Sequence, residues 1–259
     1  MFTPQGPTLR ELAVQALSSI EHGYDLLAPT FDHTPFRTPE RVLDAVTRAV
    51  RPLGPFRTGV DLCCGTGAGV GVLRQVCEER VTGVDFSAGM LAEAAARFGD
   101  EGELLGDEFA YPRPGPAVEW VRADARALPF TSAFDLAVSF GAFGHFLPAE
   151  RPGLFAQAHA ALRPGGLFVF PVPAPPPVGS RLYWTLWGFD GVMRLRNLVR
   201  RPSFVMYYRT FPLPDVLADL TRAGFTTELL PLPDLGERPD GTPRGALMVA
   251  RRGGSAHSR

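Results

Sequence analysis

The chain has 259 residues, of which 45% are hydrophobic and 20% are charged, and its formal net charge is -1. These values are typical of a soluble globular protein and provide no global field that would attract nucleic acid. All 26 basic residues are arginine. The absence of lysine excludes Walker-type phosphate loops, pyridoxal enzymes and imine-forming aldolases, because each of these needs a lysine amine.

The cysteines and histidines do not predict a metal site. Cys63, Cys64 and Cys77 are odd in number and lack the spacing of zinc ligands, and the five histidines are scattered along the chain. The first twelve residues lack a continuous apolar core, so we expect no signal peptide. The sequence therefore predicts a reduced, cytoplasmic protein that holds no metal.

Two helices are expected near the N-terminus. Apolar residues recur with helical spacing from Thr8 to Glu21 and from Pro39 to Val50. Thr38 is placed to cap the second helix, with Pro39 in its first turn. We expect residues 1–56 to form an N-terminal helical cap.

From residue 57 onward, strands and helices alternate. The expected strands are 58–64, 81–85, 118–123, 133–140, 167–172, 225–231 and 246–251, and the expected helices are 68–79, 89–98, 148–162 and 214–223. Ser87 stands where an N-cap is needed, and the glycine- and proline-rich stretch 99–115 reads as an inserted surface loop. This order predicts a Rossmann-like α/β fold with a seven-stranded, mostly parallel sheet and helices on both faces.

The same pattern divides the chain into segments. Residues 57–172 are expected to form the ligand-binding core, and 213–252 to complete it. Residues 173–212, which begin with a proline run and fall outside the alternation, are expected to be an inserted lid. Residues 253–259 are expected to be a disordered tail.

The first core strand ends in a glycine-rich turn, read as Asp61-Leu62-Cys63-Cys64-Gly65-Thr66-Gly67-Ala68-Gly69. In an open α/β sheet, ligands bind at the carboxyl ends of the strands, and glycines let the backbone approach them closely. A dinucleotide-binding turn needs another glycine where Val70 stands, and Asp61 adds negative charge where a pyrophosphate would lie. The turn therefore favours a ligand with a cationic group, such as the ammonium of an amino acid.

This turn resembles the first motif of the class I S-adenosylmethionine-dependent methyltransferases, an acid followed by GxGxG. Asp61, Gly65, Gly67 and Gly69 match it. Four further segments are similar to later motifs of the family in the right order, namely Val84–Leu91, Arg122–Phe130, Phe134–Gly141 and Leu162–Gly166. The similarity is strongest to the small-molecule group that includes enzymes of ubiquinone and menaquinone biosynthesis.

The resemblance implies S-adenosylmethionine as the cofactor and assigns residues to it. Asp85 would hold both ribose hydroxyls, Asp124 would accept the adenine amino group, and the amide of Ala125 would meet a ring nitrogen. The complete set of cofactor-binding candidates is Tyr24, Asp61, Gly65, Gly67, Asp85, Phe86, Met90, Asp124, Ala125 and Phe140.

Several candidates also have a purely structural interpretation. Asp85 can act on the dipole of the helix that Ser87 caps, and Asp124 can bond its own turn. Asp61 can accept from amides of the glycine turn, which is compatible with cofactor binding. Tyr24 resembles a tyrosine that several relatives place over the cofactor, but it can equally be a core residue.

Catalysis by this family is an in-line displacement, so the protein chiefly aligns the reactants and excludes water. A base is optional. If the acceptor is a phenol, an enol or a ring carbon, His145 is the candidate base. Many relatives carry a histidine pair or Leu-His where this chain has Gly144-His145, so a simple loop position for His145 stays open.

Residues 181–201 carry five arginines, the single acid Asp190, and Tyr183, Trp184 and Trp187. We expect them to cover the acceptor site as a lid, and the alternative is contact with an anionic membrane surface. The charges and glycines argue against a transmembrane span. An apolar or aromatic small-molecule acceptor fits the lid, whereas the oligomeric state is not indicated.

Two other functions stay open at this point. An NAD(P)-dependent oxidoreductase fits the glycine turn and Asp85, but Val70 and the absence of the Tyr-xxx-Lys pair weaken it. A non-catalytic scaffold that binds S-adenosylmethionine is the third reading, because the histidine pair is incomplete.

Overall fold

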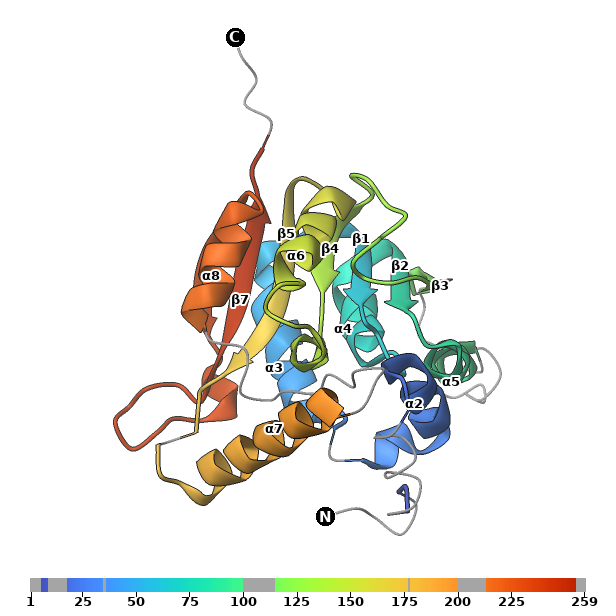
Figure 1. Cartoon of the computed structure of the whole chain (residues 1–259). Coiled ribbons are helices and arrows are strands. Elements are labelled where there is room, and N and C mark those ends of the chain that lie inside the picture. Colours follow the sequence, from blue (N-terminus) through green and yellow to red (C-terminus); the bar gives the residue numbers. More distant parts are fainter. Residues whose placement is uncertain are drawn as a thin grey trace, which may run out of the picture.

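The computed structural model places seven strands of the described residues in one sheet, in the order β3-β2-β1-β4-β5-β7-β6 (Figure 1). The structure describes residues 6–8, 18–34, 36–99, 115–176, 178–199 and 213–254. Strands β1 to β5 are parallel, and β7 runs antiparallel to β5 and β6. The strands are β1 (Phe56–Leu62), β2 (Cys77–Asp85), β3 (Ala117–Arg122), β4 (Phe134–Val138), β5 (Leu162–Pro173), β6 (Phe225–Pro231) and β7 (Gly245–Arg252). The expected seven-stranded, mostly parallel sheet is confirmed.

The central strands are buried on both faces, and their side chains alternate between two hydrophobic clusters. In β4, Leu136 and Val138 join one cluster while Ala137 joins the other. In β5, Val169 and Phe170 divide in the same way. This period of two, carried by almost uninterrupted apolar residues, is the pattern of parallel strands covered on both sides.

Helices cover both faces of the sheet (Figure 1). Helices α3 and α4 pack against each other on one face, and α6 and α8 pack against each other on the opposite face. The longer helices are α2 (Ile20–Leu27), α3 (Glu40–Val50), α4 (Ala68–Val76), α5 (Ala88–Gly99), α6 (Arg151–Ala161), α7 (Arg181–Val199) and α8 (Leu213–Arg222). Short 3-10 turns are η1 (Ala28–His33), η2 (Arg51–Leu53), η4 (Ala142–His145) and η5 (Pro233–Leu235).

The strand order reverses at β1. The chain lays β2 and β3 on one side of β1 and then returns to place β4 and β5 on the other side. In a parallel sheet this switch leaves a crevice outside the carboxyl ends of the two strands that flank it, here β1 and β4. Helices α2 and α7 lie at this end of the sheet (Figure 1).

The N-terminal helices differ from expectation in their bounds. Helix α2 begins at Ile20 because Ser19 caps it through a hydrogen bond from the amide of His22, so the expected end at Glu21 is wrong. Residues 9–17 of the expected helix lie outside the described residues. The expected cap by Thr38 is also wrong, since Pro39 is the N-cap of α3 and no side chain caps that helix.

Core boundaries also differ, most clearly at α4 and β5. Helix α4 ends at Val76 rather than residue 79, because Cys77 is extended and pairs with Phe56 of β1. Strand β5 begins at Leu162 and takes in the expected turn as an irregularity, with Gly165 at a φ of 82°. In both places pairing with a neighbouring strand overrides local sequence signals.

The segments at the margins are partly described. Helix α7 is one helix of 19 residues despite Gly188 and Gly191. Most of the expected loop 99–115 and the last five residues of the expected tail lie outside the described residues. The division of the chain into cap, core, lid and tail stays a prediction.

Candidate functional site

A cavity of about 1140 Å³ lies in the crevice at the carboxyl ends of β1, β2 and β4. Ten of the eleven residues proposed from the sequence line it, and Gly67 is the exception. The lining residues used below are Tyr24, Phe31, Phe36, Arg37, Asp61, Gly65, Gly69, Asp85, Phe86, Met90, Asp124, Ala125, Arg126, Phe140, His145, Leu182, Thr185 and Leu186. The cavity is therefore enclosed by the sheet, the N-terminal cap and α7.

The glycine turn between β1 and α4 owes its shape to two left-handed residues. Gly65 and Gly67 have φ angles of 52° and 87°, a region that favours glycine. A Cβ at Gly67 would lie 2.6 Å from the ring of Phe98, whereas a Cβ at Gly65 would meet nothing within 4 Å. Gly65 thus leaves the cavity open, and Gly67 allows helix α5 to pack closely.

Asp61 is a buried carboxylate at the end of β1. A Cβ at Gly69 would lie 2.6 Å from its carboxyl carbon, so only glycine leaves room for this side chain. Neither oxygen of Asp61 has a well-aligned hydrogen-bond partner, although the backbone amides of Gly69 and Val70 lie close to it. Burial, followed by the charge of Asp85, raises the pKa of Asp61 well above its usual range, although the nearby amides of Gly69 and Val70 partly oppose this. A cation placed in the cavity beside Asp61 would be its natural partner.

Asp85 ends β2 and holds the same turn from the other side. Its carboxylate accepts hydrogen bonds from the amides of Gly65 and Ser87, both at 2.9 Å. Burial raises its pKa, and these amide bonds oppose the rise. Because each carboxylate oxygen can accept more than one hydrogen bond, Asp85 keeps acceptor capacity toward the cavity.

The expected N-cap role of Ser87 is confirmed, because its hydroxyl accepts a hydrogen bond from the amide of Met90 in the first turn of α5 at 3.1 Å. That hydroxyl also donates to Asp25 of α2 at 2.6 Å, and Asp25 accepts from the amide of Gly89. The contact fixes the N-terminal cap onto the start of α5. In this way α2 places Tyr24 over the cavity.

A second link joins the cap to the glycine turn. The hydroxyl of Thr66 donates to Asp32 of η1 at 2.7 Å. Arg97 of α5 pairs with the same carboxylate at 3.3 Å. These contacts give Phe31 and Phe36 a fixed place in the cavity wall.

The wall beyond Asp85 is mostly apolar, and Arg126 forms ion pairs there with Asp124 and Glu150. Phe86, Met90, Ala125 and Phe140 line this part, and they leave a slot suited to a flat ring. Asp124 is bound by Arg126, whose backbone amide and guanidinium both donate to it, at 2.8 Å and at 2.7–3.0 Å. The hydrogen bonds from Arg126 lower the pKa of Asp124.

Tyr24 and His145 meet across the cavity. The hydroxyl of Tyr24 lies 2.7 Å from Nε2 of His145, and the two rings meet edge to face. Tyr24 also contacts Phe31 and Phe86 through its ring. The candidate base is therefore held by a residue from the opposite wall.

Several cavity residues were missed by the sequence interpretation. Arg126 stands two positions after Asp124, a spacing that could have suggested the pair. Phe31, Phe36 and Arg37 carry no motif, and only the folding of the cap over the sheet brings them to the site.

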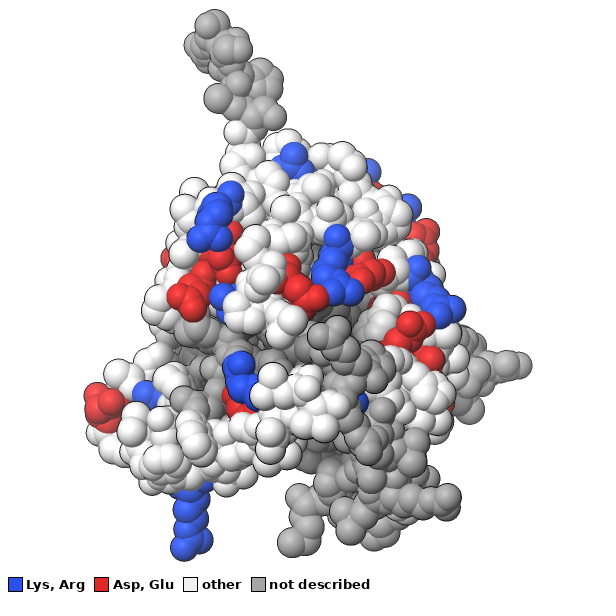
Figure 2. Space-filling model, viewed as in Figure 1, with Lys and Arg blue, Asp and Glu red and all other residues white. Residues whose placement is uncertain are grey.

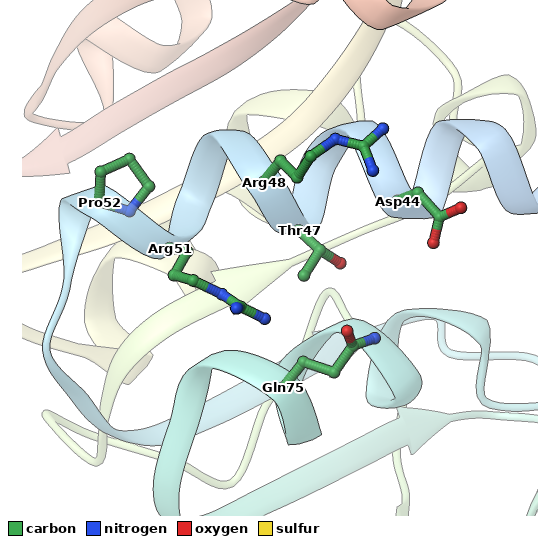
Figure 3. Close-up of a pocket in the computed structure, with 6 residues that line it drawn as sticks. All are labelled: Asp44, Thr47, Arg48, Arg51, Pro52 and Gln75. Atoms are coloured by element: carbon green, nitrogen blue, oxygen red, sulfur yellow. The ribbon is translucent and has the colours of Figure 1, made fainter.

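A second, smaller hollow of about 450 Å³ lies between α3 and α4, away from the glycine turn (Figure 3). It is lined by Asp44, Thr47, Arg48, Arg51, Pro52 and Gln75. Arg48 is already paired with Asp234 at 2.8 Å. None of the residues proposed from the sequence lies there.

Two further searches cover only the described part of the chain. Within it, no three His, Cys, Asp or Glu side chains are grouped so as to hold a metal ion. Among the same residues, no helix is long and apolar enough to cross a membrane.

Comparison with known families gives a match to a methyltransferase domain over residues 60–166. A ubiquinone/menaquinone biosynthesis C-methyltransferase of Desulfotalea psychrophila is 30% identical over 175 residues, which are 64% of this chain and 64% of that protein. The chain thus spans somewhat under two thirds of this relative. The domain match favours methyl transfer over the NAD(P)-dependent alternative.

Solved structures show the same fold. A 1,6-didemethyltoxoflavin-N1-methyltransferase of Burkholderia thailandensis, with S-adenosylhomocysteine bound, is 22% identical and has a TM-score of 0.55 over 98% of this chain and 93% of its own. A magnesium protoporphyrin IX methyltransferase of Synechocystis, also with S-adenosylhomocysteine bound, is 17% identical, with a TM-score of 0.52 and 82% of each chain covered.

Proposed function

Residues 60–166 match a methyltransferase domain, and on that premise we propose that the chain transfers a methyl group from S-adenosylmethionine to a small, apolar or aromatic acceptor. The observation that carries the proposal is Asp61, a buried carboxylate without a well-aligned hydrogen-bond partner beside an open glycine turn. An unpaired buried charge is costly, so this position suits a ligand that brings its own cation.

The amino-acid end of S-adenosylmethionine fits this turn. Its ammonium would pair with Asp61, and the absence of a Cβ at Gly65 leaves the space that the chain of the ligand needs. The sulfonium carries a second positive charge toward the same acidic wall. Asp61 and Asp85 together would offset these charges.

The nucleoside end fits the rest of the wall. Asp85 would accept from both ribose hydroxyls through the acceptor capacity that the two amides leave. Phe86 and Met90 would pack on adenine with Phe140, and Ala125 would offer its amide to a ring nitrogen. Asp124 would accept the adenine amino group in place of one of the four hydrogen bonds that it accepts from Arg126.

When bound, S-adenosylmethionine supplies an electrophilic methyl group that is displaced in line. The residues of the chain align the acceptor and exclude water from it. For an acceptor that loses a proton, the Tyr24–His145 pair would receive that proton, because the Tyr24 hydroxyl and the imidazole are already within hydrogen-bond distance.

Helix α7 is proposed to cover the acceptor. Leu182, Thr185 and Leu186 of this helix line the side of the cavity that is farthest from the sheet. These side chains are mostly apolar, as are Phe31 and Phe36 opposite, which favours an apolar or aromatic acceptor. Contact of residues 181–201 with a membrane is compatible with a lid, because it would use the other face of the helix.

The remaining proposals concern partners and location. A small molecule, and not nucleic acid, is the proposed acceptor, in keeping with the net charge of -1. Cys63, Cys64 and Cys77 are free thiols, which supports a reducing compartment such as the cytoplasm.

Turnover tests the proposal. The chain is incubated with methyl-labelled S-adenosylmethionine and a panel of phenols, hydroquinones and enols, and S-adenosylhomocysteine formation is followed. We expect turnover with at least one aromatic acceptor. Binding of S-adenosylhomocysteine without turnover across the panel would favour a non-catalytic scaffold.

A further inference from the structure

The outer face of α7 is exposed and apolar. Besides Leu182 at the edge of the cavity, its large exposed apolar side chains are Trp184, Trp187, Val192, Leu195, Leu198 and Val199. Trp184 and Trp187 are 57% and 53% exposed, and Leu198 is 84% exposed. Such a concentration on one helix is unusual for a surface that meets only water.

These residues share one face by their spacing. Positions 184, 187, 195 and 198 recur at intervals of three or four, or twice that, around an α-helix of 3.6 residues per turn. The opposite face buries Asp190 and Met193. Helix α7 is thus apolar on two sides, and within the described part of the chain it is the inner side that is buried.

The exposed charge on α7 has a single sign. Arg181 and Arg194 are exposed, and by helix geometry they lie at the two margins of the apolar face. The one acid of the helix, Asp190, is only 5% exposed. The sequence continues with Arg200 and Arg201. Figure 2 shows a broad area of uncharged atoms where α7 lies, with both basic and acidic side chains at its edges.

From this combination we propose that the outer face of α7 docks on an anionic lipid surface. Tryptophans and aliphatic side chains between arginines are suited to the boundary of lipid headgroups and acyl chains. The helix would lie on the bilayer, since no helix of the described residues could cross one.

A second copy of the chain suits this face less well. In a two-fold dimer the same patch lies on both partners, so the exposed arginines of each α7 would meet no exposed acid on the other α7. Phosphate headgroups carry negative charge that suits Arg181 at the edge of this face.

The proposal also connects with the cavity. Leu182, Thr185 and Leu186 line the cavity from the same helix. Docking would therefore hold the cavity wall close to the bilayer, a consequence that rests on the proposed function. The docking itself does not depend on methyl transfer.

Vesicle flotation tests the proposal with the whole chain. The protein is mixed with phosphatidylcholine vesicles, with or without about 30% phosphatidylglycerol, at about 0.15 M salt. We expect flotation with the anionic vesicles and little with the neutral ones. The double variant Trp184→Ser/Trp187→Ser should lower the partition coefficient at least about tenfold, and Arg181→Gln/Arg194→Gln should lower binding to anionic vesicles specifically.

The matched control is Leu26→Ser/Leu229→Ser, which removes two exposed leucines from other elements, 48% and 39% exposed. It should float like the unmodified chain. Titration with S-adenosylhomocysteine without lipid checks each variant separately, so a failure of docking is distinguishable from a failure of the proposed function.

Three results would overturn the proposal. The first is a chain that does not float with anionic vesicles. The second is equal binding to neutral and anionic vesicles. The third is a dimer in sedimentation that Trp184→Ser/Trp187→Ser dissociates, without any lipid binding, which would assign the face to a second copy.

Discussion

Replacing Asp85 is expected to remove most of the affinity for S-adenosylhomocysteine. In Asp85→Ala the acceptor proposed for the ribose hydroxyls is lost, and the amides of Gly65 and Ser87 lose the acceptor that they have in the structure. The glycine turn and the start of α5 are then both less constrained. The change therefore acts on ligand contacts and on the shape of the turn together.

The size of the effect follows from these contacts. A hydrogen bond to a charged group contributes about 1.5–3 kcal/mol, so losing two to the ribose weakens binding by about 3–6 kcal/mol. This corresponds to roughly 10²–10⁴-fold in Kd. Asp85→Asn keeps one carbonyl oxygen, so a smaller loss of about 10–100-fold is expected.

Asp135→Ala is the matched control. Asp135 also accepts hydrogen bonds from two backbone amides, those of Arg57 and Thr58, both at 2.9 Å. It lies at the start of β4, at the end of the strands that is opposite to the cavity. Calorimetric titration with S-adenosylhomocysteine should show near-normal affinity for this variant. The reasoning is refuted if Asp85→Ala binds within about threefold of the unmodified chain, or if Asp135→Ala loses as much.

Burial raises the pKa of Asp61, so affinity for S-adenosylhomocysteine should fall as pH falls through that raised value, and Asp61→Asn should bind weakly with no such dependence. Without ligand the effect of pH is opposite, because a carboxyl group with a raised pKa destabilises the folded chain once it loses its proton. The Tm of the unmodified chain should therefore fall relative to that of Asp61→Asn as pH rises through the same range, and Tm values that change in parallel with pH would contradict this. Tyr24→Phe and His145→Gln should each lower kcat about 10²-fold with an ionisable acceptor, with S-adenosylhomocysteine affinity little changed and no further loss in the double variant. Gly67→Ala, at a φ of 87°, should lower Tm by about 2–10 °C, while Gly153→Ala, whose Cβ meets nothing, should not lower it.

The alternation of strands and helices could be read from the sequence because it depends on local periodicity. Leu136, Ala137 and Val138 point alternately to the two faces of β4, and all three are apolar. A strand between two layers of helices needs this pattern. Boundaries were less predictable. The helix that ends at Val76 ends because Cys77 pairs with Phe56, a contact that no local pattern records.

In the candidate site, too, some residues could be identified from local sequence signals, whereas some contacts depend on the fold. Asp61 and Asp85 could be found because they stand at strand ends next to glycines and a cap, where topology alone brings them together. The contact between Tyr24 and His145 spans 121 positions, and it depends on Asp25 fixing α2 to α5. The pairing of Asp124 with Arg126 was missed despite their close spacing, because a motif names the acid without its partner.

Calorimetric titration of the unmodified chain with S-adenosylhomocysteine, and separately with NADH, tests the central claim most directly. We predict saturable binding of one S-adenosylhomocysteine per chain and no binding of NADH. Heat with NADH and none with S-adenosylhomocysteine would contradict the assignment of Asp61, Asp85 and the glycine turn to a methyl donor.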